Sequence, residues 1–132
     1  MNREEVIKKV IDVICESTGF EKEIITPGSI LFGELGINSI DLVELLYNLE
    51  LEYDISLKIS DLERDSGKEM DGKLFEIDNI ITKEGLLVLK NKFPEIPRDK
   101  LVPGLTTFEF VLLVTVETLA KMVLARIEEK GK

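Results

Sequence analysis

Apolar residues recur at helical spacing in several stretches of the chain, and these stretches define the predicted elements. In the first, residues 3–16, charged residues separate a single apolar stripe made of Val6, Ile7, Val10, Ile11 and Ile14. This pattern predicts an amphipathic helix that packs on other helices and ends at Gly19.

Residues 17–38 lack helical periodicity and contain the turn sequence Thr26-Pro27-Gly28-Ser29. Loops of this length in a compact domain are usually functional or are held by their own side chains. We expect the apolar residues of this loop to fix it to the core: Ile24, Ile30, Leu31, Phe32 and Leu35.

A second helix is predicted from Ser39 to about Tyr53, and it has two apolar stripes. The core stripe consists of Leu42, Leu45, Leu46, Leu49 and Tyr53. The second stripe consists of Ile40, Val43 and Tyr47, lies on the side of Ser39, and is edged by Asp41, Glu44 and Glu50. Two interpretations remain open: the second stripe is an exposed docking surface, or residues 63–104 bury it.

The start of this helix has a recognisable cap. Asn38 is a suitable N-cap, and Asp41 adds negative charge to the first turn, where the helix dipole favours it. Ser39 is then expected on the first turn with its hydroxyl facing water. A phosphate on that hydroxyl would lie at the positive end of the helix dipole, although an ordinary helix start has the same pattern.

This stretch resembles a known family. Gly36-Ile37-Asn38-Ser39-Ile40, followed by Val43-Glu44-Leu45, is similar to the phosphopantetheine-attachment motif of acyl carrier proteins. The resemblance extends over roughly residues 2–62, and a weaker similarity returns near the C-terminus at Leu105-Thr106-Thr107. The family usually has Asp-Ser-Leu where this chain has Asn38-Ser39-Ile40, so the capping ability is kept and one negative charge is absent.

The resemblance implies an all-α, acyl-carrier-protein-like helical bundle in which a separate phosphopantetheinyl transferase attaches 4′-phosphopantetheine to Ser39. The arm would hold an acyl group as a thioester for fatty-acid or related lipid or polyketide biosynthesis. Synthase or acyl-transfer enzymes with basic patches would dock on Ile40, Asp41, Val43, Glu44, Tyr47 and Glu50. An aminoacyl or peptidyl carrier, and an unmodified acidic adaptor that binds a basic partner, are the alternatives.

The acyl chain would lie between helices in an apolar pocket. The residues expected to line it are Leu42, Leu46, Phe75, Ile80, Leu86, Phe108 and Leu112. For those beyond residue 62, a larger core is an equally good interpretation.

Residues 63–104 separate this chain from an ordinary carrier protein. We expect one domain, residues 1–132, with a core of 1–62 and 105–128 and an insertion of 63–104. The link from Ile55 to Leu62 is expected to be extended or a short turn of helix. Beyond it, Leu74, Phe75, Ile77, Ile80 and Ile81 are expected to form an apolar cluster. Thr82 is expected to cap a helix that runs to about Asn91 and contains Leu86, Leu87 and Leu89.

The acidic stretch 61–76 has the carboxylates of a calcium loop but not their spacing. A loop that begins at Asp65 places Glu76 at position 12, but it puts Met70 where the sharp turn requires glycine and Gly67 where an oxygen ligand is needed. The stretch is therefore predicted to be a solvated loop.

Thr106-Thr107-Phe108-Glu109 has the spacing of a capping box and predicts a last helix that runs to about Ile127. Charged residues divide its apolar sequence, which is too short for a membrane span. We expect this helix to be buried against the insertion.

Composition narrows the function classes. The net charge is −9, which disfavours nucleic-acid binding and suits partners with basic surfaces. The chain has no histidine, so it cannot form a Ser-His-Asp or Cys-His site, and its single cysteine, Cys15, excludes an internal disulfide and a Cys/His zinc site. The resemblance implies a monomeric carrier that is not an enzyme, and the missing histidine is consistent with this. The polar start of the chain is not a secretory signal, so we expect a cytoplasmic protein, with Cys15 at the edge of the first helix.

Overall fold

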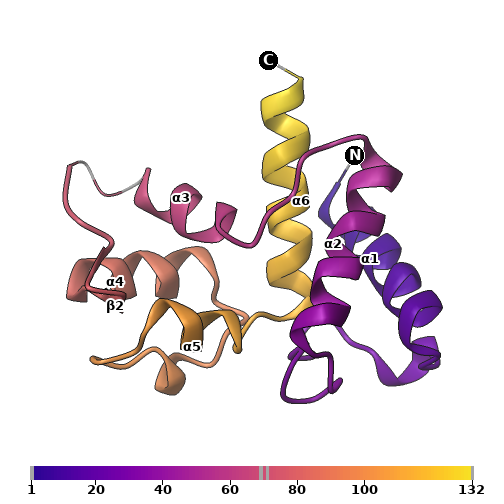
Figure 1. Ribbon diagram of the computed structural model, residues 1–132, viewed down its shortest axis with the longest axis horizontal. Helices are drawn as coiled ribbons and strands as arrows, with labels where there is room; N and C mark the ends of the chain where they lie inside the picture. Colours follow the sequence, from indigo (N-terminus) through magenta and orange to yellow (C-terminus); the bar gives the residue numbers. More distant parts are fainter. Residues whose placement is uncertain (1, 69, 71, 132) are drawn as a thin grey trace.

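The computed structural model describes residues 2–68, 70 and 72–131, and this part of the chain is mostly helical, which confirms the predicted fold class (Figure 1). The helices are α1 Arg3–Thr18, α2 Ser39–Tyr53, α3 Asp61–Gly67, α4 Lys83–Lys92, α5 Thr107–Val111 and α6 Val116–Lys130. Two 3-10 turns, η1 Lys22–Ile24 and η2 Arg98–Lys100, and a hairpin of β1 Glu76–Ile77 and β2 Ile80–Ile81 complete the elements.

Helices α1, α2 and α6 pack together on the right of Figure 1. Their shared core contains fully buried aliphatic side chains: Val6, Val10, Ile14, Leu45, Leu49, Leu119 and Val123. Helix α1 begins after the N-cap Asn2 and ends at Gly19, whose φ of 81° is left-handed and whose N–H donates to the Cys15 carbonyl. The first predicted helix is therefore correct and continues two residues further, to Thr18.

Helices α3, α4 and α5 and the hairpin lie on the other side of α6 (Figure 1). A second set of buried side chains holds this group together: Leu86, Leu89, Phe93, Ile96, Leu101 and Phe110. The rings of Phe93 and Phe110 are 6.3 Å apart at their centroids, within the range of favourable aromatic pairs. Thr82 caps α4 as predicted, but Leu87 is exposed.

The loop before α2 is fixed to the start of α6 by backbone hydrogen bonds. The Leu31 N–H donates to the Val114 carbonyl (3.0 Å), and the N–H groups of Val116 and Glu117 donate back to the loop at Ser29 (3.0 Å) and Pro27 (2.8 Å). Leu31 and Leu35 are buried as predicted. Ile24 is 57% exposed, and Ile25 is the buried side chain instead, so that part of the prediction is wrong.

The predicted single last helix is two helices. The capping box of Thr106 and Glu109 is present, but the helix it begins ends at Val111, and α6 begins at Val116 with Thr115 as its N-cap. The helix is interrupted here because the backbone of 114–117 forms hydrogen bonds with the loop before α2. The backbone of a continuous helix could not form these bonds.

The acidic stretch 61–76, predicted to be a solvated loop, begins instead with a helix whose aspartates are buried. Residues 61–67 form helix α3, and Asp61 and Asp65 are buried instead of solvated. The reason is Arg126 of α6, whose guanidinium lies 2.7 Å from an Asp65 oxygen and 3.4 Å from an Asp61 oxygen. Within the described residues, no group of three or more His, Cys, Asp or Glu side chains is placed to hold a metal ion.

The predicted apolar cluster of 74–81 is only partly formed. Phe75 and Ile81 are buried, whereas Leu74, Ile77 and Ile80 are exposed on the hairpin. Its turn residues, Asp78 and Asn79, both have positive φ (53° and 68°), as the common two-residue hairpin turn requires. None of the described helices has the length and the apolar composition that crossing a bilayer requires.

Candidate cofactor-attachment site

Ser39 is the first residue of α2, and a complete capping box holds it there. The Asn38 Oδ1 accepts from the Asp41 N–H (2.8 Å), and the Asp41 Oδ2 accepts from the Asn38 N–H (3.2 Å). Ser39 is exposed, and its hydroxyl has no hydrogen-bond partner among the residues that the structure describes. The geometry therefore leaves the Ser39 oxygen accessible on a well-defined backbone.

The residue before the cap contributes to this order. Ile37 is buried, as is Leu42, and the two occupy the positions of a hydrophobic staple around the cap Asn38. The Ile37 N–H also donates to the Leu31 carbonyl (3.0 Å). The prediction from sequence did not single out Ile37, although an apolar residue directly before a strong N-cap was a usable signal.

The site suits an anionic group. The first N–H groups of a helix have no partner within the helix, and the dipole gives this end a positive partial charge. Asn38 satisfies the N–H of Asp41, so those of Ser39 and Ile40 remain available beside the hydroxyl. A phosphodiester on Ser39 fits these donors, and a neutral substituent would gain less from them.

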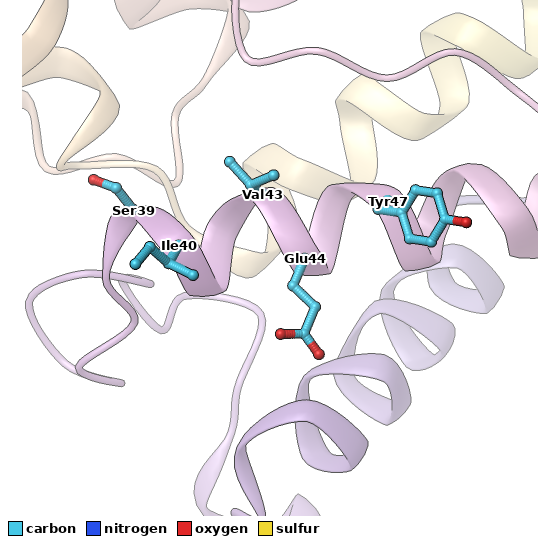
Figure 2. Close-up of a pocket in the computed structure, with 5 residues that line it drawn as sticks. All are labelled: Ser39, Ile40, Val43, Glu44 and Tyr47. Atoms are coloured by element: carbon cyan, nitrogen blue, oxygen red, sulfur yellow. The ribbon is translucent and has the colours of Figure 1, made fainter.

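An apolar surface begins directly at Ser39. Ser39, Ile40, Val43, Glu44 and Tyr47 line an open hollow of about 570 Å³ on the outer side of α2. Figure 2 shows the Ser39 hydroxyl pointing away from the helix, with Val43 on the same edge and with Ile40 and Glu44 toward the opposite edge. Ile40 is 78% exposed and Val43 is 68% exposed, so the interpretation that residues 63–104 bury them is wrong.

The acidic residues along α2 have different surroundings. Asp41 is half-buried and completes the cap, and Glu50 is half-buried with its Oε2 accepting from the Leu57 N–H (2.8 Å). Glu44 is exposed, and no described cation lies within ion-pair distance of it. Of the three, Glu44 is the carboxylate most available to a partner.

The seven residues expected to line an acyl pocket do not meet in one cavity of the described structure. Phe75 and Phe108 line one cavity, between α3 and α5, and Leu86 lines another beside α4. Leu42 and Leu46 are buried in the core, Ile80 is exposed on the hairpin, and Leu112 is half-buried in the break between α5 and α6.

Cys15 is half-buried on α1, at the edge of the helix core. Burial raises the pKa of its thiol, and the nearby Lys22 opposes this only in part. The thiol is therefore protonated at neutral pH and is a poor nucleophile.

Comparison with known proteins agrees with this site. Residues 8–67 match a family described as "Phosphopantetheine attachment site". An acyl carrier protein of Syntrophobacter fumaroxidans is 40% identical over 55 residues, which cover 42% of this chain and 68% of the relative. An acyl carrier protein of Thermotoga maritima is 35% identical over 48% of this chain and 78% of the relative. One of Chlorobium phaeovibrioides is 38% identical over 48% of this chain and 82% of the relative. No solved structure matches the chain significantly.

The matched region, the helical fold and these relatives define a carrier protein whose cofactor is 4′-phosphopantetheine. The relatives are covered over more than two thirds of their length at 35–40% identity, and the chain belongs to the acyl carrier protein family.

Proposed function

We propose that Ser39 carries the 4′-phosphopantetheine group, joined to its hydroxyl through a phosphodiester by a separate phosphopantetheinyl transferase. The single observation that carries this proposal is an exposed hydroxyl on the first turn of a capped helix, without a hydrogen-bond partner in the described part of the chain.

The other serines of the matched region are less suitable. Ser29 and Ser66 are buried, and Ser17 lies in the last turn of α1, where the dipole is negative and disfavours an anion. Ser56 and Ser60 are exposed, but neither lies in the first turn of a helix as long as α2.

Residues of this chain have distinct tasks in the proposal. When bound, the cofactor supplies a thiol that holds an acyl group as a thioester. Asn38 and Asp41 fix the turn that presents the Ser39 oxygen, and the free N–H groups of Ser39 and Ile40 favour the negative charge of the phosphodiester.

Partner enzymes are proposed to dock on the outer side of α2. Ile40, Val43 and Tyr47 offer exposed apolar contacts beside Ser39, and Glu44 offers a free carboxylate. Asp41 and Glu50 add to the acidic field although their oxygens are already engaged. With a net charge of −9, attraction to basic patches would speed the encounter and weaken as salt is added.

The cargo is proposed to be an acyl chain of fatty-acid or related biosynthesis, carried by a monomer in the cytoplasm. Its shelter is proposed in the cavity of about 300 Å³ that Phe75 and Phe108 share with apolar residues of α3 and α5, namely Leu62, Phe110 and Val111. Loading acyl chains of increasing length onto isotope-labelled protein tests this part. Amide signals of these residues should shift progressively, and unchanged signals would assign them to the core alone.

The attachment itself is tested by mass spectrometry. The protein is incubated with coenzyme A and a transferase of broad specificity, and the expected result is the mass gain of one phosphopantetheinyl group. Ser39→Ala should abolish the gain, and the matched control Ser56→Ala should retain it. No gain in the unmodified sequence would support an acidic adaptor and reject the carrier.

A further inference from the structure

Helix α4 presents an outward face with a regular pattern. Lys83, Leu86, Leu87 and Lys90 follow the spacing i, i+3, i+4 and i+7, so they lie on one side of the helix. Together with Ile81, Pro103 and Gly104, these four residues line an open groove of about 380 Å³. Leu86 is buried in its floor, whereas Leu87 is 52% exposed at its edge.

The charge of this region differs from that of the whole protein. Residues 83–104 contain five basic and three acidic side chains, whereas the whole chain contains 17 basic and 26 acidic ones. One of the three carboxylates, Glu95, is already bound to Lys121 (2.8 Å) and to the Thr118 hydroxyl (2.6 Å). Neither Lys83 nor Lys90 forms an ion pair with a carboxylate of the described residues.

We propose that this groove binds an acidic amphipathic helix of a partner protein. The partner's apolar side chains would cover Leu86 and Leu87, and its carboxylates would meet Lys83 and Lys90. The two lysines are separated by two helical turns, about 10.5 Å along the axis, so carboxylates seven residues apart on the partner helix have the matching separation.

Charge complementarity favours an acidic partner protein in this groove over a basic partner or a second copy of this chain. The outer side of α2 is apolar and acidic and suits basic partners, whereas the groove on α4 is apolar and basic and suits acidic ones. Two copies of this chain would each carry a net charge of −9, so electrostatic repulsion between them opposes self-association. The groove is therefore assigned to a different protein, and this assignment is independent of the modification of Ser39.

The test uses the full chain, isotope-labelled, and a synthetic alanine- and glutamine-based helical peptide that contains Glu-x-x-Leu-Leu-x-x-Glu. Titration should shift the amide signals of residues 83–90 and 102–104, and the shifts should diminish as salt is added. Lys83→Glu with Lys90→Glu should weaken binding about tenfold, because two attractive rim pairs become repulsive.

The matched control is Lys8→Glu with Lys58→Glu, which changes the same charge at two exposed lysines away from the groove and should bind the peptide normally. A peptide with lysines in place of its glutamates should not bind. Equal binding of both peptides, no shifts at 83–90, or undiminished binding by the groove variant would overturn the proposal.

Two further titrations identify a wrong occupant. Unlabelled full chain that shifts the same signals would give the groove to a second copy. Decanoate that shifts them when the acidic peptide does not would give it to a small amphiphile. Either result overturns the assignment to a partner protein.

Discussion

The carboxylate of Asp65 lies 2.7 Å from the Nη2 of Arg126, and this buried pair joins α3 to α6 across 61 residues of sequence. Arg126 is 6% exposed and Asp65 is 8% exposed. Asp61 and Glu129 also lie within 4 Å of the same guanidinium, at 3.4 Å and 3.2 Å. Arg126 is therefore the buried centre of an ion-pair cluster, completed by Arg64 and Lys68, where α3 meets α6.

Replacing that cation should be costly. Arg126→Met removes the buried counter-charge of Asp61 and Asp65 and leaves them only the more exposed Arg64, and we expect a loss of about 3 kcal/mol in the free energy of unfolding. Arg64→Met is the control, because Arg64 belongs to the same cluster but its side chain is 53% exposed. Its loss should stay below about 1 kcal/mol. Urea unfolding measures both, and equal losses would show that burial of Arg126 is not the cause.

Gly85 is the second position with a clear expectation. A Cβ built there would lie 2.6 Å from the Phe75 carbonyl oxygen and 2.9 Å from the Ile81 Cγ2, because the hairpin passes directly over α4. We expect Gly85→Ala to destabilise the protein by about 1–3 kcal/mol, since overpacking exceeds the gain in helix propensity of about 1 kcal/mol.

The control is Gly67→Ala at the end of α3, where nothing lies within 4 Å of the added Cβ. This change should leave the midpoint of thermal unfolding unchanged or raise it. A Gly85→Ala protein that melts at or above the temperature of the Gly67→Ala protein would contradict the close contact.

The cap of α2 can be tested without touching Ser39. Asn38→Ala removes the acceptor for the Asp41 N–H and should cost about 1 kcal/mol, and the frayed first turn should slow modification of Ser39. Asn38→Asp keeps the acceptor and should retain the stability. Denaturation curves and a time course of the mass gain provide both readouts. An alanine variant as stable as the aspartate variant would be evidence against the cap.

The outer side of α2 should be important for docking and not for folding. Ile40→Ser with Val43→Ser changes side chains that are 78% and 68% exposed, so the melting temperature should change little. The rate of phosphopantetheinylation at limiting transferase should fall severalfold. Leu51→Ser, at a residue that is 65% exposed outside the hollow, is the control and should be modified at the normal rate.

Cys15 should react slowly. Because burial raises the pKa of its thiol, little thiolate is present at neutral pH, and alkylation by iodoacetamide should accelerate as the pH rises toward that pKa. Intact-mass measurements of the apo protein at several pH values follow the reaction. Rapid, pH-independent alkylation at neutral pH would contradict a half-buried, protonated thiol.

Sequence reasoning succeeded where the determinants were local. The cap residue Asn38 predicted where α2 begins, and the apolar spacing up to Tyr53 predicted where it ends. The structure has the same limits. The N-cap at Asn38 and the capping box at Thr106 were likewise predicted, because each is complete within four residues, and the structure adds that Asp41 closes a capping box at Asn38 as well.

It failed where the determinant is distant in sequence. Asp61 and Asp65 look like loop residues until Arg126 is placed beside them. Thr115 begins a new helix inside an apolar run because the neighbouring backbone pairs with residues 27–31, more than 80 positions earlier. The seven residues expected to line an acyl pocket are spread over several places for a related reason: apolar character was visible at Ile80 and Phe108, but their positions depend on the hairpin and α5.

The backbone ladder between residues 27–31 and 114–117 has a consequence for synthesis in the cell. The segment that leads into the serine gains these long-range partners only after residues 114–117 have been synthesised. A nascent chain that ends before residue 114 therefore lacks an ordered approach to Ser39. Attachment of the prosthetic arm should accordingly follow synthesis of residues 114–117, and products truncated before them should escape loading.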